Sequence, residues 1–175
     1  MTAKFTAHAH SMTRVDVSTG VPFDEFRAAF EKAAPPLDAE ATYRVITRGG
    51  SWDDVRAAAE ANAPNGLMVY WSIDATPLMA VAGHRTRAVE YLLGNHVIAE
   101  SMFRYNPRTL LYAPLRVLIY ADADDNAVFS MDRPGTAFGS LGVDAITAVG
   151  EDLDRRVAAL LRVIGVDADE AFATG

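Results

Sequence analysis

One apolar stripe in the last third of the chain constrains the fold more than any other feature. Its members recur every three or four positions and are Ile146, Val149, Leu153, Val157, Leu160 and Ile164. This spacing places their side chains on one face of an α-helix of roughly five turns. So long an apolar face needs a broad surface to cover it, and we expect that surface to be a β-sheet. Asp144 precedes the stripe and is expected to cap the helix.

Several other segments have the residue pattern of β-strands, namely residues 14–18, 67–73, 115–121 and 127–131. In the first of them Val15 and Val17 alternate with polar residues, which predicts a half-buried strand. The last two are joined by the acidic turn 122–126, which favours a β-hairpin. Residues 67–73 are apolar on both faces, so we expect a central strand that is covered on both sides.

Helical patterns occupy most of the remaining chain, in residues 23–34, 37–48, 51–62, 86–94 and 95–103. The segment 37–48 fits a helix or a strand, and we favour the helix. Ser51 and Asp54 have the spacing of a capping box, while Thr86 and Asn95 are candidate caps of the last two helices. Asn95 is also a candidate ligand-binding residue beside His96. We expect a turn or short helix after Asn106 and a glycine-rich loop that ends at Gly142.

The order of these segments predicts an α+β fold, because strands and helices do not alternate strictly as they do in a doubly wound parallel sheet. We expect residues 13–166 to form a single domain. Residues 1–12 are predicted to be a flexible N-terminal tail, and residues 167–175 a C-terminal tail. A chain of 175 residues can bury a sizeable core without a metal or disulfide staple.

Composition excludes several classes of function. The net charge of -7 opposes binding to a phosphate backbone, so we expect no nucleic-acid partner. The chain has no cysteine, which excludes disulfides, thiolate nucleophiles and cysteine-ligated metal centres. No apolar run approaches the ~18 residues of a membrane span, and the N-terminus lacks the apolar core of a signal peptide. We therefore predict a cytoplasmic protein without a membrane contact.

The middle and end of the chain, roughly residues 67–166, resemble domain of unknown function family 302. The residues that carry the resemblance are Gly94-Asn95-His96, Ile98-Ala99-Glu100, Met102-Phe103-Arg104-Tyr105-Asn106-Pro107 and Leu111-Tyr112-Ala113-Pro114-Leu115-Arg116, followed by Phe129, Asp132-Arg133-Pro134, Phe138-Gly139 and Leu153-Asp154. The resemblance implies a two-layer β-α-β(4)-α fold, in which a long C-terminal helix packs on an antiparallel sheet. It carries no established reaction, and many family members have proline where this chain has His96.

His96 is the most interesting titratable residue of the middle region. It follows Asn95 in the first turn of a predicted helix, where an imidazole can act as a donor, a base or a metal ligand. The alternative is a structural histidine that bonds to nearby backbone. His84 is near in sequence, but no HxH or HExxH spacing accompanies the pair, and we expect no metal site and no cofactor.

A group of arginines and tyrosines is a second candidate site. Its members lie around the start of strand 115–121 or just after strand 127–131, and they are Arg104, Tyr105, Arg108, Tyr112, Arg116 and Arg133. Guanidinium groups bind carboxylates and phosphates with paired hydrogen bonds, so this group favours a small anionic or polar ligand. The alternative is that these arginines form ordinary ion pairs with Glu100, Asp122 and Asp132.

Three functions remain open at this point. The first is a regulatory or small-molecule-binding module, expected to be a homodimer, with a pocket near His96 between the sheet and the C-terminal helix. The second is a cofactor-independent enzyme that uses His96 as acid or base, with Arg104 or Arg116 orienting an anionic substrate. The third is a haem or metal carrier in which His96 acts with Met102 or Met79. No GxSxG or phosphate-loop motif supports another chemistry.

Overall fold

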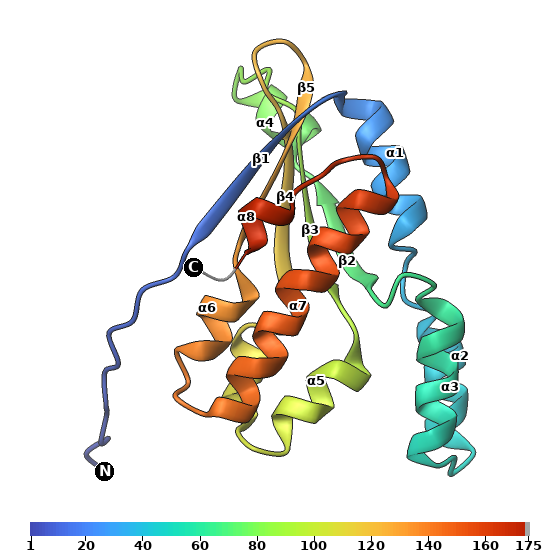
Figure 1. Ribbon diagram of the computed structural model, residues 1–175, viewed down its shortest axis with the longest axis vertical. Helices are drawn as coiled ribbons and strands as arrows, with labels where there is room; N and C mark the ends of the chain where they lie inside the picture. Colours follow the sequence, from blue (N-terminus) through green and yellow to red (C-terminus); the bar gives the residue numbers. More distant parts are fainter. Residues whose placement is uncertain (174–175) are drawn as a thin grey trace.

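A single five-stranded antiparallel sheet organises the computed structural model, which describes residues 1–173. The strand order is β1-β5-β4-β3-β2 (Figure 1). The strands are β1 (Arg14–Pro22), β2 (Met68–Asp74), β3 (Ala88–Gly94), β4 (Leu115–Ala121) and β5 (Asn126–Asp132). Mixed helices and an antiparallel sheet confirm the predicted α+β class, and the hairpin of β4 and β5 is confirmed.

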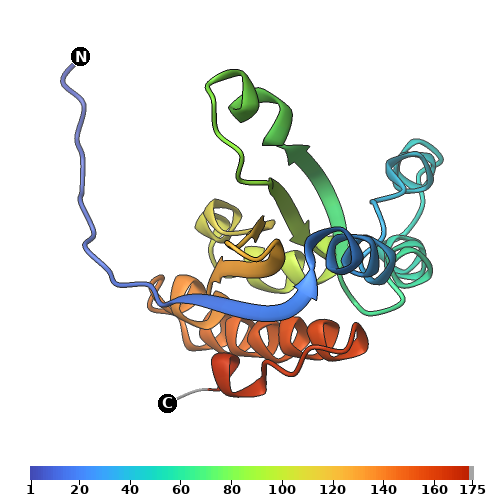
Figure 2. The same ribbon diagram turned by 90° about the horizontal axis from the view of Figure 1, so that it is seen from above.

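Helices lie mainly on one face of this sheet, as the view from above shows (Figure 2). They are α1 (Phe23–Ala33), α2 (Ala39–Thr47), α3 (Trp52–Asn62), α4 (Thr76–Val81), α5 (His96–Phe103), the 3-10 helix η1 (Pro107–Leu111), α6 (Pro134–Gly139), α7 (Asp144–Val163) and α8 (Asp169–Phe172). Helix α7 is the long C-terminal helix, and α1 lies beside it against the same face (Figure 2). No helix among residues 1–173 is both long and apolar enough to cross a lipid bilayer.

The hydrophobic core fills the space between the inner face of the sheet and helices α1 and α7. Alternate residues of the strands point inward, so Val117, Ile119 and Phe129 are completely buried. The ring of Phe30 on α1 lies 6.0 Å from that of Phe129, centroid to centroid. From α7 the predicted stripe supplies Ile146, Leu153, Val157 and Leu160. The prediction that the long helix covers the sheet is therefore confirmed.

The first two predicted elements and the helices before β2 are also confirmed. Strand β1 runs four residues further than expected, because Gly20 lies inside the strand with φ +66° and does not turn the chain. Its pairing with β5 is irregular between Ser18 and Pro22. The ambiguous segment forms helix α2, although none of its residues is buried. Ser51 and Asp54 form the predicted capping box of α3.

The helix predicted for residues 86–94 is wrong, because this segment forms strand β3. Val89, Leu92 and Leu93 have helical spacing, but in the structure Val89, Tyr91 and Leu93 are the buried residues. This alternation is the period of a strand, and it is fixed by pairing with β2 on one side and β4 on the other.

Strand β2 is not the central strand that its apolar sequence predicted. It lies at an edge of the sheet, and Trp71 and Ile73 are exposed. Only its beginning is covered at the free edge, where Pro36 forms a parallel bridge with Val69. The apolar residues on its outer face therefore remain in contact with solvent.

Two smaller expectations near the C-terminus also need correction. The glycine-rich segment before Gly142 is not a loop throughout, because Pro134 starts helix α6. The cap position of α7 is Val143, so Asp144 is the first helical residue and makes no side-chain cap bond there. Asp144 still lies at the end of the helix where a negative charge is stabilising.

The two predicted tails differ from each other in the structure. Residues 1–12 form no helix or strand and extend away from the sheet (Figure 1). Residues 167–175 were expected to be a tail, but α8 lies within them and Phe172 is buried in the main core. Residues 174 and 175 lie outside the described part of the chain.

Candidate functional site

A cavity of about 210 Å³ lies between the sheet, α5 and α7, at the position where the sequence predicted a pocket. Its wall includes residues of β3, β4, α5, η1, α6 and α7, namely Leu93, Leu115, Ile98, Met102, Leu110, Phe138 and Leu153. These side chains are all apolar. The polar side chains that line the cavity are Tyr70, Asn95 and His96.

The junction of β3 and α5 places His96 in this wall. The side chain of Asn95 accepts a hydrogen bond from the backbone N–H of Val97 at 2.9 Å, which caps α5. Its amide nitrogen also donates to the carbonyl of Gly66 at 3.0 Å. Asn95 therefore fixes where the helix starts, and this explains its role without a ligand.

Tyr70 on β2 holds the imidazole of His96. Its phenol oxygen lies 2.9 Å from Nδ1 of His96. The other ring nitrogen, Nε2, is buried and has no hydrogen-bond partner within residues 1–173. Burial lowers the pKa of His96, because the charged imidazolium loses its hydration. Burial also raises the pKa of Tyr70 to about 12, although the backbone N–H of His96 acts in the opposite direction.

No pattern in the sequence around His96 indicates its contact with Tyr70. Tyr70 lies 26 positions earlier, in the strand that pairs with β3. The register of that pair shifts between Val69 and Trp71. This irregularity belongs to the pairing of two strands, so no local spacing could have revealed it.

Two of the predicted arginines lie outside the cavity. Arg104 is exposed just after α5 and pairs with Glu100 at 2.5 Å. Arg116 is 79% exposed on β4 and pairs with Glu90 at 3.0 Å. Both pairs are of the exposed type that contributes little to stability. For these residues the structure shows the ordinary ion pairs that were the alternative to a site.

Arg133 forms a buried ion pair on the other side of the core. Its guanidinium donates to Asp154 of α7 at 3.1 Å and to the carbonyl of Phe172 at 3.2 Å. The Asp154 carboxylate is 1% exposed and also accepts a bond from the backbone N–H of Gly135. Burial raises the pKa of Asp154, against the opposing effect of Arg133. This pair joins the start of α6 to α7 and α8, and it does not line the cavity.

The two predicted tyrosines are also apart from the cavity wall. Tyr105 is exposed. Tyr112 packs against Phe138, with ring centroids 5.9 Å apart, and its hydroxyl lies 3.1 Å from Nε2 of His10. Of the arginine and tyrosine group, Tyr112 and Arg116 line a second pocket together, whereas Arg104, Tyr105 and Arg133 do not line it.

The haem and metal alternatives depend on which side chains lie near His96. Met102 lines the same cavity as His96, whereas Met79 is exposed on α4. Within residues 1–173 no three histidine, aspartate or glutamate side chains converge as metal ligands do. The cavity is also smaller than the ~300–1,000 Å³ typical of ligand pockets.

Comparison with known proteins confirms the resemblance found in the sequence. Residues 44–164 match the family described as Domain of unknown function DUF302. The chain is also similar to an uncharacterised conserved DUF302 protein from Bacillus stearothermophilus, whose crystal structure is known. The TM-score is 0.59 at 19% identity, covering 87% of this chain and 97% of that one, which shows a shared fold. No curated protein matches the sequence significantly.

Proposed function

Because the chain belongs to the DUF302 family, whose function is unknown, we propose a function from the cavity itself: the protein binds a small, uncharged molecule. The molecule is mainly apolar and carries one hydrogen-bond acceptor. The observation that carries this proposal is the buried Nε2 of His96, which has no partner within the described chain although its side chain lines an apolar cavity. A buried polar atom without a partner is costly, and a ligand atom would remove that cost.

The size and lining of the cavity support a small apolar molecule. An apolar cavity of ~150 Å³ in another protein is large enough to bind benzene. The present cavity of about 210 Å³ has room for a somewhat larger compound. Its walls carry no charged side chain, so an anion would lose its hydration without gaining an ionic partner.

The contact with Tyr70 determines what His96 offers to a ligand. With its pKa raised to about 12, the phenol of Tyr70 keeps its proton at neutral pH. We propose that the phenol O–H donates to Nδ1, 2.9 Å away, and that the ring proton lies on Nε2. His96 is then a neutral donor, and the ligand must supply an oxygen or nitrogen acceptor.

The rival enzymatic function has less support. A neutral imidazole with a lowered pKa suits a general base, but Arg104 and Arg116 do not line the cavity. They are paired with Glu100 and Glu90 instead. A small anionic substrate oriented by these arginines is therefore not favoured by the geometry.

A homodimer and a cytoplasmic location remain part of the proposal. Association with a second copy is supported by apolar side chains that stay exposed on the outer face of the sheet, including Trp71 and Ile73. Light scattering tests it, because a dimer has twice the 18.9 kDa mass of the chain. Cell fractionation tests the location.

A matched pair of probes tests ligand binding. Cyclohexanone has one acceptor oxygen, while methylcyclohexane has almost the same shape and none. Titrated into ¹⁵N-labelled protein, both are expected to shift amide resonances of α5 and of Phe138, which surround the cavity. Methylcyclohexane gains more than cyclohexanone from leaving water, so the affinities are compared between proteins. The bond to His96 is expected to give cyclohexanone a preference of about 3- to 10-fold relative to a variant without this donor, as one hydrogen bond of ~1 kcal/mol predicts.

Two variants give this experiment its controls. In His96→Phe the preference for cyclohexanone is expected to disappear, because the donor is gone. In Ala99→Leu both probes are expected to lose affinity, because the added side chain occupies the cavity. Shifts that map away from the cavity, or no shift at millimolar probe, would show that the cavity is not a binding site.

A further inference from the structure

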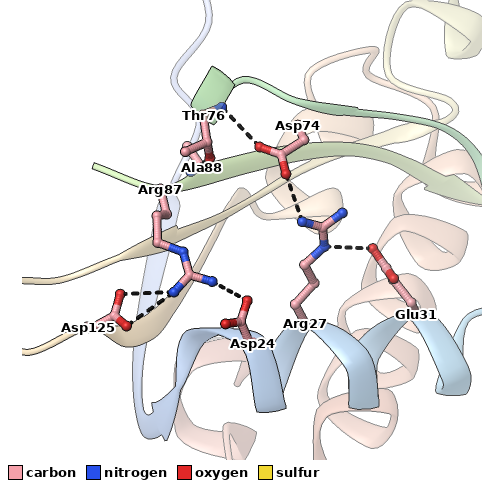
Figure 3. A network of polar contacts seen from close by, with 8 residues as sticks. All are labelled: Asp24, Arg27, Glu31, Asp74, Thr76, Arg87, Ala88 and Asp125. Atoms are coloured by element: carbon pink, nitrogen blue, oxygen red, sulfur yellow. Dashed lines mark hydrogen bonds and ion pairs between the residues drawn. The ribbon is translucent and has the colours of Figure 1, made fainter. Parts of the chain in front are cut away.

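An arm of residues 74–88 projects beyond the sheet between β2 and β3 and includes helix α4 (Figure 1). The arm starts at Asp74, the last residue of β2, which is bonded to α1. Arg27 donates to the Asp74 carboxylate at 2.8 Å, and Asp74 accepts a second bond from the backbone N–H of Thr76 at 2.9 Å (Figure 3). The hydroxyl of Thr76 accepts from the backbone N–H of Ala88 at 3.1 Å. The two ends of the arm are thus bonded to each other and to the helix.

Arg87 holds the returning end of the arm in the same way. Its guanidinium pairs with Asp24 of α1 and with Asp125 of the β4–β5 turn, the latter at 3.1 Å (Figure 3). It also lies over the ring of Phe23, 4.3 Å from the centroid. The arm is therefore fixed at its base to α1 and to the β4–β5 turn, and it presents α4 in a defined position.

The arm exposes apolar side chains that such a short helix does not need for its own fold. Leu78 is 66% exposed and Val81 is 87% exposed, and Met79 is exposed beside them. None of the residues of α4 is buried. An exposed apolar group of this kind on a rigid support is typical of a contact surface.

The outer face of the sheet next to the arm carries a second group of exposed apolar side chains. Trp71, Ile73 and Leu118 point away from the core. The strand registers place Ile73 opposite Glu90 and Glu90 opposite Leu118, so these residues lie in one row across three strands. Figure 2 shows that α1 and α7 lie on the other face, with the arm standing out beyond β2 and β3.

The charges on this outer face favour a second copy of the same chain as its partner. Two copies carrying a net charge of -7 each repel one another unless the contact surface is close to neutral. Here Arg116 pairs with Glu90 and Arg14 pairs with Asp132, so these charges cancel within the chain. A face without excess charge can meet a second copy without strong repulsion.

Two further charges are complementary between the arm and the outer face. Arg85 of the arm and Asp16 of β1 have no ionic partner within residues 1–173. Asp16 is paired in register with Ser130, and Ser130 with Leu118, so Asp16 lies on the outer face. An arm laid on the outer face of another copy brings these opposite charges toward each other.

From these observations we infer that two copies form a symmetric dimer, in which the arm of each copy lies on the outer sheet face of the other. This inference rests on the homodimer proposed above and adds the surface that forms it. A two-fold axis makes each contact occur twice, so Leu78 and Val81 of one copy cover Trp71, Ile73 and Leu118 of its partner.

The first test measures mass by light scattering after size-exclusion chromatography. The unchanged chain is expected to run as a dimer, and the double variant Leu78→Asp with Val81→Asp as a monomer at the same concentration. The matched control is Tyr43→Asp with Ile46→Asp on α2, whose side chains are 66% and 64% exposed and lie outside this surface. The control is expected to remain a dimer, and circular dichroism checks that both variants fold.

The absence of cysteine from the chain makes a second test unambiguous. A Leu78→Cys protein mixed with a Leu118→Cys protein is expected to form a disulfide-linked pair on mild oxidation, whereas Tyr43→Cys with Leu118→Cys is not. A dimer that survives the Leu78 and Val81 changes, or no link in the first mixture, overturns this surface but leaves the homodimer standing. A wild-type monomer at every concentration overturns both.

Discussion

The phenol oxygen of Tyr70 lies 2.9 Å from Nδ1 of His96 and gives this imidazole its one hydrogen-bond partner within residues 1–173. The contact links an edge strand to the first turn of α5. The second ring nitrogen is buried and has no hydrogen-bond partner in this part of the chain, while the His96 side chain lines the cavity. The chemistry available at the cavity therefore depends on a residue that the local sequence around His96 does not contain.

The lowered pKa of His96 predicts a loss of stability in acid. Below the ordinary value of about 6.5 the unfolded chain takes up a proton that the folded chain resists, so the free energy of unfolding falls until the folded-state pKa is passed. The decrease between pH 7 and pH 5 is expected to be smaller in His96→Gln. NMR titration of the His96 ring provides the direct check. A midpoint at or above the ordinary value would contradict it.

The long helix and the main strands were predictable because their apolar residues follow one clear period. Residues 86–94 were not, because Val89, Leu92 and Leu93 also fit a helix. This segment forms a strand because β2 and β4 pair with it on both sides. Trp71 and Ile73 led to the wrong prediction of a central strand, because both apolar side chains lie on an exposed outer face.

The candidate site was only partly predictable for a similar reason. His96 was identified because it follows the helix cap Asn95, and this local pattern survives in the structure. Arg104, Arg116 and Arg133 looked like one group because they flank the same strands, yet each has its own acidic partner. Sequence proximity does not determine the side of the sheet or helix to which a side chain points.

The buried pair of Arg133 and Asp154 predicts strong coupling between two substitutions. Arg133→Met alone is expected to cost about 3–5 kcal/mol of unfolding free energy, because it leaves a buried carboxylate without its cation. Adding Asp154→Leu is expected to restore much of that loss. Urea unfolding of both single variants and the double variant measures the coupling. A double variant no more stable than Arg133→Met would contradict the prediction.

Gly150 allows helices α6 and α7 to approach closely. A Cβ at this position would lie 2.9 Å from Cβ of Phe138 and 3.0 Å from the carbonyl oxygen of Pro134. Gly150→Ala is therefore expected to lower the melting temperature, although alanine favours a helix by about 1 kcal/mol over glycine. Gly139→Ala is the control, because its Cβ would meet nothing closer than 3.6 Å. Equal melting temperatures for the two variants would disagree with this packing.

Replacing Thr76 is expected to change hydrogen exchange in the arm but not at the cavity. Its hydroxyl accepts a bond from the backbone N–H of Ala88, so Thr76→Val is expected to speed hydrogen exchange of that amide at least several-fold. The amide of Val97, which Asn95 holds, is expected to exchange as before. Two-dimensional NMR in deuterated water follows both amides. Unchanged exchange at Ala88 would show that this bond does not hold the arm.

The pairing of β1 with β5 sets the order in which the molecule can be assembled during translation. Arg14 and Asp132, which face each other across these strands, are 118 positions apart. The ribosome therefore releases β1 long before its neighbour has been made. The first strand to emerge is among the last to be paired, and until then its backbone N–H and C=O groups are open to nascent chains nearby.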